Sequence, residues 1–198
     1  MFGGLQVRRI QNVEYLHSAL RDDLRDLRCN FEELSEARKD FLENEFPGLL
    51  VDAHFKAETL RSKSKIKRIA RILISSLKEG LSVSADYSEE MMRVATALED
   101  VDIEVLKQVV ATQAQYLGGK GFLDLNEANT VWKSKPPTID GMTTAEVSSI
   151  CLKLESFGLI TRVERDKFTF GLETAGLPFG LLSKGLDFVR FAIKEGEG

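Results

Sequence analysis

The spacing of apolar residues changes abruptly in one stretch of the chain, between residues 143 and 172. In its first part the apolar positions have the spacing of an amphipathic helix: Val147, Ile150, Cys151, Leu154 and Phe157. After a glycine, the side chains alternate with a period of two in the runs 159–163 and 168–172, with a turn between them. A two-residue period is typical of strands with one buried face. The stretch therefore predicts a helix followed by a two-stranded hairpin.

Both ends of this helix carry sequence signals. At the start, Thr143 and Glu146 have the spacing of a capping box, in which each residue's side chain binds the other's backbone amide. At the end, Gly158 suits the left-handed conformation that commonly terminates a helix. We therefore expect the helix to begin after Thr143 and to end before Gly158.

Residues 154–160 read Leu-Glu-Ser-Phe-Gly-Leu-Ile and resemble the Leu-Glu-x-x-Gly-Leu-Ile segment of the winged helix-turn-helix superfamily. Two further segments extend the resemblance over about half of the chain: 102–114 resembles the first helix of that fold, and 181–189 the start of its closing helix. Residues 118–140 depart from the pattern where the second helix belongs, although 125–132 suits a short helix. The resemblance implies a winged-helix-like domain with the capped helix as its recognition helix.

In a DNA-binding winged helix, the recognition helix contacts base edges, and basic residues nearby contact phosphates. The corresponding positions here are Thr144, Ser148, Ser149 and Lys153 in the helix, Arg162, Arg165 and Lys167 in the hairpin, and Lys133 and Lys135 in the loop. However, the helix carries one lysine against two glutamates, and residues 101–198 have a net charge of −2. Because DNA affinity needs a concentrated basic surface, these charges favour packing, dimerisation or protein docking. A DNA-binding transcriptional regulator is the alternative.

In the N-terminal half, apolar residues follow a heptad pattern from Ile10 to Phe41. The pattern predicts one long helix, which Pro47 and Gly48 are expected to end. A stripe this narrow needs a partner, either another helix of the same chain or a second copy in a coiled coil. For self-association, the expected contact residues are Leu20, Leu24, Leu27, Phe31 and Leu34.

The next two segments have opposite charge, +6 over residues 60–80 and −6 over residues 84–104. Serines lie near the start of both segments, with Ser62 or Ser64 expected to cap the first helix and Ser84 the second. Their apolar stripes are Ile66, Ile69, Ala70, Leu73 and Leu77, then Met91, Met92, Val94, Ala95 and Leu98. We expect a helix pair that neutralises its own charge, so that the basic run is not a ligand site. Residues 65–73 are also similar to a basic helix of uncharacterised bacterial helical proteins, a common type of helix.

The sequence thus predicts a mainly α protein with a small β-hairpin. We expect a helical bundle or coiled-coil domain at residues 1–98 and a winged-helix-like domain at 99–198. The partner is expected to be a protein or a second copy, plausibly in a homodimer, with DNA less favoured. The longest uncharged apolar run, 72–74, is far shorter than the roughly 20 residues that span a bilayer. We therefore expect a soluble, cytoplasmic chain without a membrane partner.

Catalytic and metal-binding patterns are missing from the sequence. The sequence contains no Gly-x-Ser-x-Gly motif and no Cys/His nucleophile pair, and its Asp and Glu residues show no spacing that defines a paired-carboxylate site. We therefore expect a non-enzymatic protein without a cofactor. His17 and His54 each lack an acidic or cysteine neighbour at ligand spacing, so no metal site is expected. Cys29 and Cys151 are expected to be reduced thiols.

Overall fold

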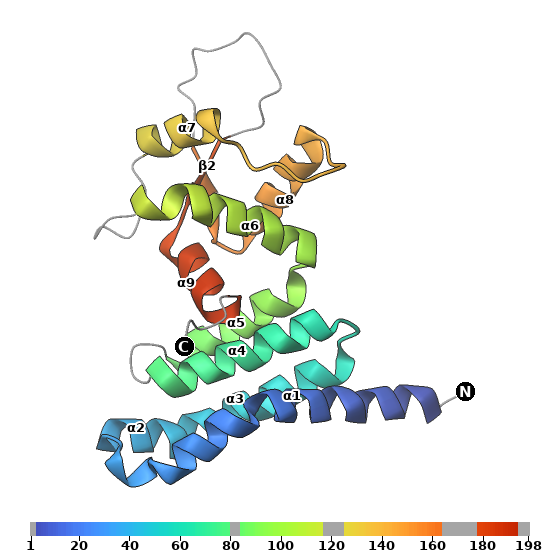
Figure 1. The fold of residues 1–198 in the computed structure, drawn as a ribbon, viewed down its shortest axis with the longest axis vertical. Helices are drawn as coiled ribbons and strands as arrows, with labels where there is room; N and C mark the ends of the chain where they lie inside the picture. Colours follow the sequence, from blue (N-terminus) through green and yellow to red (C-terminus); the bar gives the residue numbers. More distant parts are fainter. Residues whose placement is uncertain (1–2, 80–83, 117–124, 164–177, 194–198) are drawn as a thin grey trace. The chain divides into compact units, whose positions relative to one another are not determined.

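The chain is mainly helical, as its apolar periodicity predicts. The computed structural model describes residues 3–79, 84–116, 125–163 and 178–193 (Figure 1). Two compact units are present, residues 1–98 with 191–198, and residues 99–190. None of the described helices is both long and apolar enough to cross a membrane.

The first unit consists of packed helices. Its elements are α1 (Gly3–Cys29), the short turn η1 (Phe31–Glu33), α2 (Glu36–Asp40), the π-helical turn η2 (Phe41–Glu45), α3 (Phe46–Thr59), α4 (Lys63–Glu79) and α5 (Ala85–Ala97). Helix α1 packs against α3 and α4, and α4 packs against α5 (Figure 1). Helix α1, which covers the first part of the heptad segment, therefore packs against helices of the same chain.

The expected continuous helix over residues 10–41 is wrong, because α1 ends at Cys29. Asn30 leaves the helical conformation with a ψ of 12°, and Ser35 is extended with a ψ of 150°. Asparagine and serine readily bind nearby backbone groups in non-helical conformations, which explains why the helix stops there. The heptad pattern continues across this break although the helix does not.

Pro47 does not end a helix, contrary to expectation. It lies in the first turn of α3, where its missing amide hydrogen costs least, and the wider turn η2 directly precedes it. The backbone therefore continues without a break from α2 through η2 into α3.

Helices α4 and α5 form as expected. The Ser62 hydroxyl accepts from the amide of Lys65 at 3.4 Å, and the Ser84 hydroxyl accepts from that of Tyr87 at 3.2 Å. Both predicted apolar stripes are buried. Between the helices, the buried hydroxyls of Ser76 and Ser88 lie 2.7 Å apart and satisfy each other.

In the described residues, the second unit combines helices with two short strands. Its elements are α6 (Asp100–Gln113), the short turn η4 (Ala114–Tyr116), α7 (Leu125–Ser134), α8 (Thr144–Ser156), β1 (Ile160–Arg162), β2 (Phe179–Leu181) and α9 (Ser183–Ala192). The predicted short helix at 125–132 is present as α7. The order of elements is helix, helix, helix, strand, strand, helix.

Helix α8 has the ends that the sequence predicts. The capping box is formed, with the Thr143 amide donating to the Glu146 carboxylate at 2.7 Å and the Thr143 hydroxyl accepting from the Glu146 amide at 3.3 Å. Gly158 has a φ of 68°, a left-handed backbone conformation that is strained for residues with a side chain. This left-handed residue turns the chain from α8 into β1.

The strand that pairs with β1 lies later in the chain than expected. Strands β1 and β2 are antiparallel, with Ile160 opposite Leu181 and Arg162 opposite Phe179. The predicted second strand at 168–172 falls outside the described residues. Leu181, expected at the start of the closing helix, is instead a buried strand residue, and α9 begins at Ser183.

Gln113 of α6 completes the hydrogen bonding of β2. Its buried side-chain amide donates to the Phe179 carbonyl at 3.0 Å and accepts from the Leu181 amide at 2.8 Å. One glutamine therefore supplies to β2 the donor and acceptor that a further strand would supply.

Gly185 allows α9 to lie close to the backbone before β1. The Leu182 amide donates to the Leu159 carbonyl at 3.1 Å, one turn before Gly185. A Cβ atom at position 185 would overlap the same Leu159 carbonyl oxygen and touch the Leu181 side chain at 3.0 Å. The glycine is thus required by the approach of α9 to the strands.

We expect Gly185→Ala to destabilise the second unit by about 1–3 kcal/mol, because backbone on both sides must shift to admit the methyl group. Gly48→Ala is the matched control, since a Cβ atom at that position would have nothing within 4 Å, and it is expected to stabilise by up to about 1 kcal/mol. Urea unfolding of both variants measures the difference. Equal effects would contradict the close approach.

Candidate functional site

The solvent-facing side of α8 is the candidate functional site. Its described residues, which we call the α8 face, are Thr144, Ser148, Ser149, Leu152 and Ser156. Thr144, Ser149 and Ser156 are exposed, Ser148 is half-buried, and Leu152 keeps 41% of its surface exposed. The opposite side of α8 is buried through Val147, Ile150, Cys151 and Leu154. The face offers short hydroxyls around one apolar side chain.

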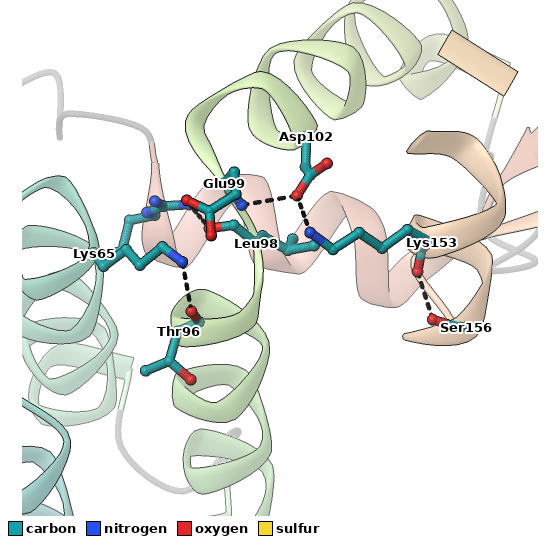
Figure 2. A network of polar contacts seen from close by, with 8 residues as sticks. Lys65, Thr96, Leu98, Glu99, Asp102, Lys153 and Ser156 are labelled. Carbon is teal, nitrogen blue, oxygen red and sulfur yellow. Dashed lines mark hydrogen bonds and ion pairs between the residues drawn. The ribbon is translucent and has the colours of Figure 1, made fainter. Parts of the chain in front are cut away.

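Lys153, the only lysine of α8, is bound within the second unit. Its ammonium lies 2.5 Å from the carboxylate of Asp102 on α6, as Figure 2 shows. The Asp102 side chain is 4% exposed and also accepts from the Glu99 amide at 2.7 Å, which closes the capping box of α6. Because a buried carboxylate needs a compensating charge, Lys153 is held on the α6 side of the helix.

Arg162 of β1 is neutralised in the same way. Its guanidinium lies 2.8 Å from the carboxylate of Glu155 on α8, and the other Glu155 oxygen accepts from the Arg162 amide at 2.9 Å. The two positively charged side chains of α8 and β1 are therefore both paired with carboxylates.

Four further residues were predicted to contact phosphates: Lys133, Lys135, Arg165 and Lys167. Lys133 and Lys135 are exposed at and just beyond the end of α7. Arg165 and Lys167 lie outside the described residues. Among the described residues, the α8 face therefore carries Thr144, Ser148 and Ser149 of the predicted DNA contacts, but no lysine or arginine.

Part of the basic segment on α4 is buried against the end of α5. The Lys65 ammonium donates to the Thr96 carbonyl at 2.8 Å (Figure 2). The Arg68 guanidinium donates to the Leu98 carbonyl at 3.2 Å. These side chains are only 8% and 5% exposed. Carbonyls at a helix C-terminus carry partial negative charge, which these cations balance. Lys65 and Arg68 of the basic run thus have structural roles at the end of α5.

Neutralisation of the basic run also involves helices other than α5. Lys78 of α4 lies 2.9 Å from the carboxylate of Asp23 on α1. Arg71 donates to the carbonyl of Ile193 at 2.5 Å. The expected pairing between the 60–80 and 84–104 segments therefore describes only part of how this charge is satisfied.

The residues predicted for self-association lie at different depths. Leu20 is fully buried in the first unit, and the others, Leu24, Leu27, Phe31 and Leu34, are half-buried. The exposed apolar side chains of this unit lie elsewhere, at Val51 and Phe55 on α3 and near the start of α1. Val51 and Phe55 are 52% and 65% exposed and share one face of α3, being four residues apart. Sequence periodicity missed them because they lie outside the heptad.

Neither cysteine has the environment of a nucleophile. Burial raises the pKa of the Cys151 thiol to about 12, which keeps it protonated, and Cys29 is exposed and free.

The described residues also contain no group of three or more side chains arranged to hold a metal ion. An open hollow between η2, α3 and α5 is lined by Glu45, Asp52 and Glu89, and Asp52 pairs with Lys56 at 2.5 Å. Among the described residues, this hollow with its Asp52–Lys56 pair shows no catalytic arrangement.

Comparison with known proteins adds no family to this description. No protein-family model, curated protein or solved structure matches the chain. The chemistry of the described surfaces is therefore the basis for a functional proposal.

A double-mutant cycle tests the coupling between α6 and α8. Asp102→Asn and Lys153→Met are each expected to destabilise the second unit by about 1–3 kcal/mol, because each leaves one charge without its partner. The double variant should be more stable than the sum of the two losses predicts, by about 1 kcal/mol or more. Urea unfolding measures all four proteins, and additive losses would show that the pair contributes no coupling.

Proposed function

We propose that this chain is a non-enzymatic interaction and assembly protein whose second unit is a winged-helix-like domain that docks another protein. The observation that carries the proposal is the ion pair between Lys153 and buried Asp102, which neutralises the single lysine of α8 within the unit.

The winged-helix part of the proposal has support from two directions. The 154–160 segment resembles that superfamily, and the described elements follow the order helix, helix, helix, strand, strand, helix. In that scheme α8 is the recognition helix, and β1 with β2 forms the base of the wing.

The chemistry of the α8 face favours a protein over DNA. Readers of the major groove generally use arginine, lysine, asparagine or glutamine side chains, and the face presents none of these. Leu152, surrounded by hydroxyls, suits the mixed apolar and polar character of a protein interface. A protein partner would bury Leu152 without having to neutralise Glu146 or Glu155.

Self-association through the first unit is the assembly part of the proposal. Phe55 and Val51 form an apolar patch on α3, which we call the α3 patch. Large aromatic side chains supply much of the binding energy at protein interfaces, and Phe55 is the most exposed large apolar side chain among the described residues. A second copy offers the same patch, so that a symmetric dimer would cover both.

A DNA-binding regulator is the second candidate. It is favoured by Lys133 and Lys135, whose exposed side chains follow one another closely at the end of α7. Such lysines suit phosphate contacts, which position a protein on DNA without reading its sequence.

A DNA titration distinguishes the two candidates. Using fluorescence anisotropy with a labelled duplex in about 50 mM salt, we expect binding weaker than about 10⁻⁴ M, the weak end of non-specific affinity. The Lys133→Glu, Lys135→Glu double variant should behave like the wild type. Tighter binding that falls with rising salt and is lost in this variant would overturn the docking proposal in favour of the regulator.

Light scattering over a range of protein concentrations tests self-association. We expect dimers that Phe55→Glu weakens by about tenfold or more, because the dimer would bury a charge in place of an aromatic ring. Thr59→Glu places the same charge at an exposed polar position of α3 and should leave the dimer intact, as should Leu152→Glu on α8. A wild-type protein that remains monomeric at every concentration would exclude the assembly role.

A further inference from the structure

The two histidines of the chain meet although 37 residues separate them. His17 lies on α1 and His54 on α3, and their Nε2 atoms are 2.5 Å apart. The rings are stacked, with centroids 4.6 Å apart and an angle of 29° between their planes. Each imidazole therefore directs the same nitrogen toward the other ring.

A buried asparagine fixes the register that brings the histidines together. The Asn12 side-chain amide donates to the carbonyls of Ala57 and Leu60, at 3.0 and 2.8 Å. Asn12 thus faces the end of α3, while His17, further along α1, faces the earlier residue His54. The two helices run antiparallel, and five residues along α1 carry the chain from the Asn12 contact to the histidine pair.

The pair is held in the state that binds metal ions. Two ring nitrogens at this distance have room for one proton between them, so one Nε2 must offer a lone pair. A nitrogen lone pair of this kind is what a metal ion requires of an imidazole ligand.

We propose that His17 and His54 form a two-histidine clip for a divalent transition-metal ion of the class that imidazole binds well, namely Zn²⁺, Ni²⁺ or Cu²⁺. Bonds of about 2.0–2.1 Å from a metal to nitrogen place two neighbouring ligand atoms roughly 3.0–3.4 Å apart. The two rings need to separate by less than about 1 Å to reach this spacing. The ion replaces the shared proton as the bridge between them.

The surroundings of the pair suit such an ion. His17 is exposed and His54 half-buried, so an ion reaches the site directly from solvent. Because the described residues place no third ligand there, water completes the coordination. The clip joins α1 to α3 and so stabilises the first unit by binding only its folded form. This role is independent of the proposed docking function.

Calorimetric titration with ZnCl₂ tests the clip on the full chain without a histidine tag. We expect one Zn²⁺ per chain, with an affinity that His17→Gln and His54→Gln each reduce by about tenfold or more, since each variant removes the chelate. All proteins carry Cys29→Ser, which excludes zinc binding by the exposed thiol. Zinc should also raise the Tm of the parent protein by several degrees, but not that of either variant. No binding by the parent, or equal binding by the variants, would overturn the proposal.

Nuclear magnetic resonance provides a test that needs no histidine variant. Because the chain has only two histidines, their ring signals are easily resolved. Added Zn²⁺ should shift the signals of both rings with the same concentration dependence. A shift of one ring alone, or of neither, would show that the two residues do not share an ion.

Discussion

A carboxylate that is taken out of water needs compensating charge or hydrogen bonds, and in the second unit Asp102 obtains both from its surroundings. The Glu99 amide closes the start of α6 around it, and Lys153 brings α8 against α6. One buried group thus fixes a helix end and the placement of the neighbouring helix. The same pairing affects what α8 presents to solvent, because the lysine that would give its surface positive charge is neutralised by the Asp102 carboxylate. The functional proposal follows from this structural requirement.

The first unit satisfies its buried charges by a different route. Lys65 and Arg68 bind carbonyls at the C-terminal end of α5, where the helix has partial negative charge. Charge runs in the sequence therefore say little about surface potential here. Residues 60–80 have a formal charge of +6, but two of their cations, Lys65 and Arg68, bind carbonyls at the end of α5. The sequence predicted neutralisation between the two helices, and the structure shows that Lys65 and Arg68 bind carbonyls at the end of α5.

Features set by neighbouring residues were predictable, and features set by tertiary contacts were not. The capping box of Thr143, the left-handed Gly158 and the apolar stripes of α4 and α5 depend on local spacing, and each forms as predicted. The prediction of one continuous heptad helix was wrong because the apolar spacing continues across Asn30, where the helix ends. The pairing of β1 with the strand at Phe179–Leu181 was not predicted, because it depends on contacts that are distant in the sequence. Lys153 lies on α8 and Arg162 on β1, and their ion pairs with Asp102 and Glu155 depend on tertiary contacts that the sequence does not reveal.

The histidine pair shows why a chemically competent arrangement can escape a search by spacing. Motif searches look for ligands a few residues apart, because a single helix or turn then brings them together. His17 and His54 instead depend on the register of two antiparallel helices, which the Asn12 amide fixes by binding the final carbonyls of α3. A shift of α1 by one turn would move the imidazoles about 5 Å apart along the helix axis, too far for one ion to bind both. In a helical unit of this kind, a buried polar side chain that sets register therefore also determines which surface residues can act together.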